Sequence, residues 1–364
     1  MRKVMLSLLA VVALQVFAQD SLQTEQPEKK MSWLRRTIRG FSYVDENYVE
    51  PQHYNWSVML QATHTYDYYR LSATGPNAQS ILLSPTASYK VGPYFGWRWV
   101  FLGYTFDLKN ISFGSSSMKQ EFDFSIYSAQ IGADIYYRRT GSDYKIRQLD
   151  MGSNHKTSSM EGLPFDGLSV AITGVNLYYI FNHKRFSYPA AFAQSTIQKI
   201  SCGSWMVGLA YILNSIDFDH EKLQTMINER MGTDAVQLNP GLMFNSVEYH
   251  NISASVGYAY NWVFARNWLF CPSLSLALAY KRTYSEAGEK YSAFNFNLNN
   301  FNIDGIGRFG FVYNNMRWYA GASAIIRAYN YHKSRFAANN LFGSLNLYVG
   351  YNFGARSRYK KNKQ

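Results

Sequence analysis

Apolar and polar residues alternate along most of this chain, in runs of roughly 10 to 16 residues. In one run, Leu345, Leu347 and Val349 alternate with the polar Ser344 and Asn346. A period of two places unlike residues on the two faces of a β-strand. Soluble strands usually have about 5–6 residues, whereas a tilted strand needs about 9–11 to cross a bilayer. The pattern therefore favours a transmembrane barrel with apolar side chains facing lipid and polar ones inside.

About twelve such segments follow one another. They cover residues 54–65, 81–95, 99–108, 119–128, 130–139, 167–182, 201–214, 246–263, 267–281, 301–313, 317–331 and 340–353. We therefore predict an all-β, antiparallel, up-and-down transmembrane barrel over residues 54–353. Ten or fourteen strands remain open as alternatives, because the segments near 119–139 and 183–200 are the least regular.

The connections between these segments alternate in length. Short ones fall at Gly96–Arg98, Ala129, Phe264–Arg266 and Asn314–Met316. Long ones fall at 66–80, 109–118, 140–166, 215–245, 282–300 and 332–339. Short periplasmic turns and long extracellular loops are typical of outer-membrane barrels. An even strand count then places both chain ends on the short-turn, periplasmic side.

Tryptophan placement supports the same orientation. Seven of the eight tryptophans lie beside the ends predicted to be periplasmic: Trp56, Trp97, Trp99, Trp205, Trp262, Trp268 and Trp318. Aromatic girdles form where a barrel meets the membrane–water interface. We predict that these residues form the periplasmic girdle.

The amino terminus has the features of a cleaved secretory signal. Arg2 and Lys3 precede an apolar stretch from Val4 to Val16, and Val16-Phe17-Ala18 is a suitable cleavage site. The stretch is too short for a membrane-spanning helix, although an uncleaved helical anchor is the alternative. We predict a signal peptide over 1–18, a periplasmic lead-in over 19–53 and a basic periplasmic tail over 354–364. The expected location is the outer membrane of a Gram-negative bacterium.

Charge and cysteine content add little to this picture. The net charge is +12, but nucleic acid is not an expected partner in this compartment. Much of the excess lies near the two ends of the chain, where the C-terminal cluster is either a solvated tail or a contact for anionic headgroups or cell wall. Residues 30–41 lie on the inner leaflet or form a disordered lead-in. Cys202 and Cys271 fall two strands apart, about 9–10 Å, so we expect no disulfide.

Two connections are irregular. The connection 183–200 is long where the alternation of lengths predicts a short turn. It is rich in aromatic residues around a proline turn: Phe186, Tyr188, Pro189 and Phe192. This segment is a plug within the lumen, a lid or docking surface beneath the barrel, or an ordered long turn. The loop 215–245 contains a predicted helix with Leu223, Met226, Ile227 and Arg230 on one face, begun by Asp219 and ended by Gly232.

The inward phase of the strands carries a group of charged residues. The acids are Asp107, Glu121, Asp123 and Asp134, and the bases are Arg138, Arg308 and Arg327. Because unpaired charges in a narrow interior are costly, we expect acids to meet bases in a lumenal salt-bridge network. The alternative is a polarised constriction that selects solutes by charge.

Several local motifs suggest a family. They are Asp45-Glu-Asn-Tyr-Val-Glu-Pro51, Asp134-Ile-Tyr-Tyr-Arg-Arg-Thr-Gly141, Phe186-Ser-Tyr-Pro-Ala-Ala-Phe192 with Gln198-Lys199 and Gly203-Ser204, and Tyr313-Asn-Asn315. Through these motifs, the chain resembles a family of outer-membrane barrel proteins of Bacteroidetes-type bacteria, classed as a domain of unknown function. The resemblance covers nearly the whole mature chain. The resemblance implies a barrel and carries no catalytic residues.

No catalytic motif stands out among the seven histidines. His332-Lys333-Ser334, and His64 near Asp67, are weak candidates for the Ser–His type of site that barrel lipases use. Metal-ligand spacing and phosphate loops are absent from the sequence, so we expect no metal and no cofactor. The leading hypothesis is a non-enzymatic envelope protein, either a narrow or gated channel or a scaffold for an envelope complex. A lipid- or lipopolysaccharide-modifying enzyme is the alternative. Expected partners are outer-membrane lipid, lipopolysaccharide and an envelope protein.

Overall fold

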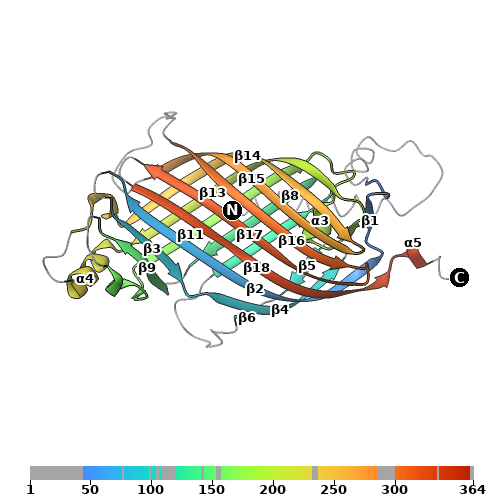
Figure 1. The fold of residues 1–364 in the computed structure, drawn as a ribbon, viewed down its shortest axis with the longest axis horizontal. Coiled ribbons are helices and arrows are strands. Elements are labelled where there is room, and N and C mark those ends of the chain that lie inside the picture. Colours follow the sequence, from blue (N-terminus) through green and yellow to red (C-terminus); the bar gives the residue numbers. More distant parts are fainter. Residues whose placement is uncertain are drawn as a thin grey trace.

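One antiparallel sheet makes up most of the molecule. The computed structural model describes residues 44–75, 78–97, 100–103, 106–107, 120–140, 143–152, 157–231, 237–284, 300–333 and 336–360. Within them, sixteen strands form a single sheet and two more form a separate two-stranded sheet. The large sheet curls around on itself, with its strands steeply tilted to the long axis of the molecule (Figure 1).

Long strands follow one another around the curved wall. In spatial order they are β2 (Tyr54–Ala73), β18 (Phe336–Ala355), β17 (Trp318–Lys333), β16 (Phe301–Asn314), β15 (Trp268–Tyr284), β14 (Ser246–Ala265), β13 (Cys202–Phe218), β11 (Leu168–Ile180), β8 (Ile131–Arg139) and β7 (Gln120–Tyr127). Sequential neighbours pair throughout β13 to β18, as an up-and-down order requires. The last strand returns to the first long one, with Tyr351 opposite Val58 and Ser344 opposite Thr65.

The other edge of β2 carries shorter strands. β4 (Ser88–Trp97) pairs with β2, and β5 (Val100–Gly103) and β6 (Phe106–Asp107) pair with β4. Within the described ranges β7 pairs with β8 alone, so no ladder there joins β6 to β7. The prediction of an all-β, antiparallel sheet is confirmed, and the up-and-down order holds from β13 to β18. Complete closure and the count of twelve strands stay predictions.

Many strands are longer than the sequence pattern predicted. β2 continues to Ala73, and β17 and β18 continue to Lys333 and from Phe336. The predicted long connections 66–80 and 332–339 are therefore wrong over most of their length. The connection 140–166 is also not a simple loop. Within it, β9 (Tyr144–Asp150) pairs with β3 (Ser80–Pro85), and β10 (Pro164–Phe165) pairs with β9. This same β9 pairing accounts for the break between β3 and β4.

The ends of these strands were predicted too early because the apolar residues change phase along several of the long strands. On β2, Val58 and Leu60 are exposed on the outer face, but farther along Tyr69 and Leu71 are buried on the inner face and Arg70 is exposed. β14 makes the same switch, from exposed Ile252 and Val256 to buried Tyr249 beside exposed Glu248. One part of the wall is therefore apolar outside, and the other part is apolar inside.

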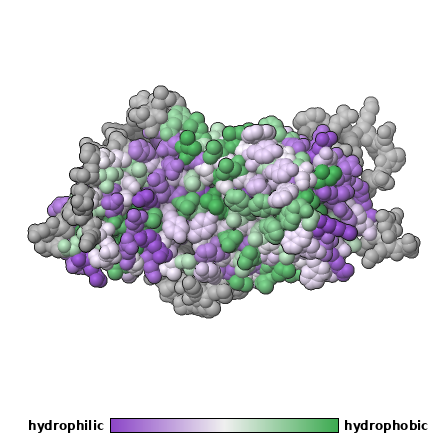
Figure 2. All heavy atoms as spheres, in the orientation of Figure 1, coloured by the Kyte–Doolittle hydropathy of each residue, from purple (hydrophilic) through white to green (hydrophobic). Residues whose placement is uncertain are grey.

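The surface reflects this switch. Hydrophobic residues gather across the middle of the wall, while hydrophilic residues predominate toward the α4 end and at the opposite end (Figure 2). A strand keeps its ladder hydrogen bonds on both sides of the switch. A search for apolar residues in the outward phase alone therefore ends each strand too early.

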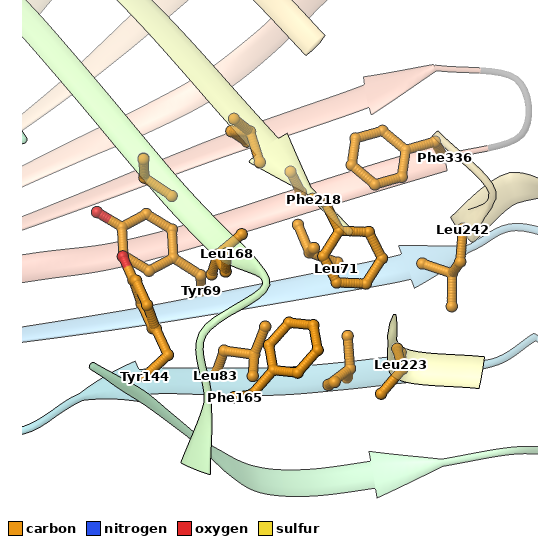
Figure 3. Close-up of a cluster of buried hydrophobic side chains, with 14 of the residues drawn as sticks. Tyr69, Leu71, Leu83, Tyr144, Phe165, Leu168, Phe218, Leu223, Leu242 and Phe336 are labelled. Atoms are coloured by element: carbon orange, nitrogen blue, oxygen red, sulfur yellow. The ribbon is translucent and has the colours of Figure 1, made fainter. Parts of the chain in front are cut away.

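The inward-apolar half contains a packed cluster that we call the apolar core. It is formed by side chains of β2, β8, β11, β13, β14, β17 and β18 together with those of β3, β9 and β10. Leu223 and Ile227 of α4 (His220–Met231), Leu242 of η3 (Pro240–Leu242) and Met160 of η2 (Ser158–Met160) complete it (Figure 3). As predicted, 215–245 holds a helix that begins at Asp219, whose carboxylate accepts a 2.9 Å hydrogen bond from the Lys222 backbone. Gly232 lies outside the described residues.

The opposite end of the wall is covered by segments from three parts of the chain. β1 (Val49–Pro51) pairs with β12 (Thr196–Gln198), α3 (Tyr188–Phe192) lies between them and the lumen, and α5 (Ser357–Lys360) ends the described chain here (Figure 1). We call residues 45–53, 183–200 and 356–359 the end cap. Both described ends of the chain therefore lie at one end of the barrel, as predicted. No described helix is long and apolar enough to cross a membrane.

Candidate functional site

An ion pair crosses the barrel interior between the apolar core and the end cap. Arg308 of β16 pairs with the Asp134 carboxylate of β8, and both side chains are almost fully buried. Asp134 also accepts hydrogen bonds from Ser125 (2.8 Å) and Asn176 (3.0 Å). The Arg308 guanidinium lies 5.1 Å from the centre of the Tyr178 ring. The carboxylate thus has three donors in a site without bulk water.

Two further buried pairs lie in the interior, each with members that the sequence analysis did not select. Arg138 donates to Asp67 of β2 at 2.6 Å. Lys281 of β15 donates to Asp304 of β16 at 2.7 Å, and Asn251 donates to the other Asp304 oxygen at 2.8 Å. The structure therefore places Asp134, Arg138 and Arg308 in buried ion pairs, and it adds Asp67, Lys281 and Asp304, which the sequence analysis did not select.

Of the four remaining predicted charged residues, the structure describes the side chain of Arg327 and the strand positions of the other three. Arg327 is buried, and its guanidinium lies 4.6 Å from the centre of the Tyr136 ring. Glu121 lies opposite Arg138 in the β7–β8 ladder, and Asp123 lies two residues farther along β7. Asp107 lies opposite Lys90 in the β4–β6 ladder. The side chains of Asp107, Glu121 and Asp123 lie outside the described part of the molecule.

The irregular segment 183–200 enters the lumen. Phe186, Tyr188 and Pro189 are buried, and Phe192 is partly buried. The Tyr188 hydroxyl donates to Ser273 Oγ at 2.9 Å and accepts from Arg308 at 3.4 Å. Burial raises the pKa of Tyr188, which keeps this donor protonated. Of the three open interpretations, the plug agrees with these contacts, and we call α3 the plug helix.

Glycine makes room for the plug helix. A Cβ atom at Gly310 of β16 would lie 3.1 Å from the Ala191 carbonyl oxygen and 3.2 Å from the Ala191 Cβ. Both distances are shorter than ordinary van der Waals contacts. The carbonyl oxygen belongs to the backbone, so it cannot easily move away. The plug helix therefore rests directly on the wall at Gly310, two residues from Arg308.

Gln198 holds the end cap together. Its carboxamide oxygen accepts from the Ser187 backbone (2.8 Å) and from Asn261 (2.9 Å), and its amide donates to the carbonyls of Arg185 (2.7 Å) and Ile200 (2.9 Å). The side chain is buried. One residue thus links the plug segment to strand β14.

Replacing Gln198 with leucine is expected to loosen the end cap, because several buried polar partners lose their hydrogen bonds at about 1–3 kcal/mol each. Limited trypsin digestion should then cut at Lys184 and Arg185 faster than in the unaltered protein. Lys199→Gln is the control, because this neighbouring side chain is exposed and bonds one exposed carbonyl. Equal cleavage rates in all three proteins would contradict the role given to Gln198.

A polar region remains between the plug helix and the apolar core. Thr63 donates to Asn346 at 2.8 Å, Gln61 donates to Thr63 at 3.0 Å, and Asn346 donates to Ser323 at 3.3 Å. All four side chains face inward and are only partly buried. The interior therefore consists of an apolar core, a polar middle crossed by ion pairs, and a plug.

The predicted aromatic girdle lies at the end-cap side of the wall. Trp56, Trp97, Trp205, Trp262 and Trp318 are exposed and Trp268 is partly exposed. Their rings contact other aromatic side chains, such as Trp318 with Tyr351 at 4.6 Å and Trp268 with Tyr313 at 5.1 Å between centroids. Trp99 lies outside the described residues. This arrangement suits an interfacial belt.

The candidate catalytic residues are not brought into a Ser–His pair in the described part of the chain. His64 stacks on Tyr89, with 4.5 Å between centroids. His332 is exposed near the end of β17, and Ser334 lies outside the described residues. Cys202 and Cys271 are both free, as predicted.

The fold and interior define an all-β protein of the antiparallel barrel class. The family model described as "Domain of unknown function (DUF4421)" matches residues 43–353, and the chain belongs to this family. No curated protein matches the chain significantly.

Several solved structures resemble the chain at low sequence identity. They include the outer membrane protease OmpT from Escherichia coli, with 7% identity, a TM-score of 0.36 and coverage of 82% of this chain and 97% of that one. The toluene transporter TodX from P. putida has 8% identity, a TM-score of 0.27 and coverage of 83% and 91%. The translocator domain of autotransporter NalP from Neisseria meningitidis has 10% identity, a TM-score of 0.27 and coverage of 82% and 88%. Similarities at this level carry no argument about activity.

Proposed function

We propose that this protein is an outer-membrane barrel with a sealed lumen that serves as a scaffold for an envelope complex. The observation that supports this most is closure of the interior from both ends. The apolar core joins seven strands of the wall at one end, and the plug helix fills the lumen at the other. A permanent pore needs a continuous polar path, and a packed apolar layer opposes one.

The outward apolar band supports a membrane location. Leu345, Leu347 and Val349 of β18 are exposed on the outer face of the sheet. Together with the aromatic belt at one margin, they match a lipid-facing surface. We assign the end cap to the periplasm and the α4 end to the cell exterior, on the short-turn and long-loop pattern.

Leu347→Arg is expected to lower the free energy of unfolding by roughly 2–4 kcal/mol, the usual cost of a charge in the middle of a lipid-facing barrel wall. Asn339→Arg, on the same strand and face but beyond the apolar band, should have little effect. Urea unfolding of barrels refolded into vesicles measures both. Equal losses of stability in the two variants would show that the membrane boundary does not lie between Leu347 and Asn339.

Single-channel recording in planar bilayers tests the sealed lumen. The folded protein should show no steady conductance at moderate voltage. Stable conductance from the unaltered protein would exclude a scaffold with a sealed lumen.

Site-specific photo-crosslinking in cells tests the scaffold role. We propose the end cap as the binding surface, because the exposed cations Lys184, Arg185 and Lys199 lie on it. A photoreactive residue at Lys184 should give a discrete crosslinked envelope protein. The same residue at Glu221 on α4 should not give that product. A pattern that is the same at both positions would argue against an end-cap partner.

A gated channel is the second candidate, and the polar middle of the lumen supports it. The partly exposed Gln61, Thr63, Ser323 and Asn346 would suit a water-filled path if the two seals opened. Conductance that appears only after displacement of the plug helix would favour this function.

A further inference from the structure

Seven polar side-chain atoms deep in the barrel lack a hydrogen bond of normal length and angle to any of the described residues. They are the hydroxyls of Tyr69 and Tyr249, both amide atoms of Asn214 and of Asn340, and the amide oxygen of Asn251. All five residues are at most 2% exposed. Buried polar groups in folded proteins nearly always have a partner, so a cluster of seven such atoms calls for a ligand.

These side chains form one connected group. Asn214 lies opposite Tyr249 in the β13–β14 ladder, and Asn340 lies opposite Tyr69 in the β18–β2 ladder. The Asn340 amide also approaches the Tyr249 hydroxyl as a weak hydrogen-bond partner, and this contact joins the two sides of the barrel. The Tyr249 ring stacks on Tyr331 with 4.5 Å between centroids and is thereby fixed in position.

Buried ion pairs flank the group on two sides. Asn251 donates to Asp304, which pairs with Lys281. On the other side, Asp67 lies two residues from Tyr69 on the same face of β2 and pairs with Arg138. Both carboxylates are thus already neutralised by cations. A ligand between them therefore needs no charge.

The chemistry of the group points to a small, neutral molecule that can both donate and accept hydrogen bonds. Amide nitrogens donate, amide oxygens accept, and tyrosine hydroxyls do either. The near-complete burial of all five residues leaves no place for a large ligand. Water satisfies all these requirements, because a buried water makes about three hydrogen bonds to polar groups.

We propose that Tyr69, Asn214, Tyr249, Asn251 and Asn340 bind a cluster of about two to three ordered water molecules within the apolar core. These waters bridge the β13–β14 side of the barrel to the β18–β2 side. They also extend the polar contacts from the Lys281–Asp304 pair toward the Arg138–Asp67 pair. The apolar core thus encloses a small, isolated group of bound waters of fixed geometry and still seals the lumen.

Hydroxyl-radical labelling by synchrotron radiolysis of the folded, unaltered protein tests this proposal. Radicals form from bound water, so Tyr69 and Tyr249 should be modified several times faster than their burial suggests. Tyr319 is the matched control, because it is equally buried and its hydroxyl is bonded to Ser57 at 2.7 Å. Labelling of Tyr69 and Tyr249 as slow as that of Tyr319 would overturn the proposal.

Thermal unfolding tests the proposal independently, because the direction of the change in midpoint distinguishes hydrated amides from dry ones. If waters satisfy the amides, Asn214→Leu with Asn340→Leu removes their hydrogen bonds and lowers the midpoint of thermal unfolding. If the amides are dry and unsatisfied, the same change removes a buried penalty and raises the midpoint. A rise would overturn the proposal. Because the labelling uses the unaltered protein, failure of this variant to fold would not decide the matter.

Discussion

Arg308→Met should lower the free energy of unfolding by roughly 3–5 kcal/mol, the usual cost of breaking a buried ion pair by removing one partner. Methionine keeps most of the side-chain volume but leaves Asp134 as an uncompensated buried charge. Ser125 and Asn176 still donate to this carboxylate, but neither supplies a positive charge. Urea unfolding of the refolded barrel measures the change.

Two further variants separate the charge effect from packing. Adding Asp134→Asn to Arg308→Met removes the orphaned charge and should restore most of the lost stability, since neutral replacements of buried pairs are often well tolerated. Lys222→Met breaks an exposed pair with Asp166 and should leave the unfolding curve unchanged. A loss in the double variant as large as in the single one would show that packing, not charge, accounts for the effect.

Gly310→Leu should displace the plug helix from the wall. The new side chain would meet the Ala191 backbone oxygen and Cβ, so the plug helix must move or the wall must distort, at about 1–3 kcal/mol for overpacking. We expect faster trypsin cleavage at Lys184, Arg185 and Lys199. Because the apolar core remains in place, we expect no conductance in planar bilayers.

Gly305→Leu is the matched control on the same strand. A Cβ atom there would find its nearest neighbour, Leu276 Cδ2, at 3.9 Å, and the position belongs to the outer face. It should behave like the unaltered protein in both assays. If Gly310→Leu conducts and Gly305→Leu does not, the gated channel becomes the favoured function and the sealed scaffold is excluded.

The part of the wall with an apolar outer face was predictable because its signal is local. Apolar residues at alternate positions, as from Leu345 to Val349, mark both the strand and its outward face. The half of the barrel with an apolar interior was missed because its apolar residues, such as Tyr69 and Leu71, occupy the opposite phase. Continuing β2 in the inward phase past Thr65 would have revealed it.

The candidate site was predicted in part for a similar reason. Arg308 lies in a well-patterned strand, so its inward phase was clear, and Asp134 and Arg138 share one phase within the predicted segment 130–139. Asp67 fell in a segment assigned to a loop, and Lys281 stood at the margin of its segment. Asp304 could have been predicted from the sequence, because it lies four residues before Arg308 and therefore on the same face of the strand. The pairing of partners required the curvature of the sheet, which one sequence does not encode locally.

The plug is a different case. Aromatic residues 186–192 pointed to burial, but a plug, a lid and an ordered turn all bury such residues. What distinguishes them is a set of contacts distant in sequence, such as Asn261 with Gln198 and Ser273 with Tyr188. These depend on which strands pass beneath the segment.

The reversal of apolar phase also constrains how such a barrel reaches its final position. The α4 half carries exposed charges such as Arg70 and Glu248 on its outer wall, and moving charged side chains through hydrocarbon is costly. A finished cylinder therefore cannot slide lengthwise through a bilayer with this half leading. In the proposed orientation, with the α4 end at the cell exterior, assembly instead passes the α4 half across while its strands are still unpaired or shielded. The ladders there would then form after translocation, and those of the half with an apolar outer face during insertion.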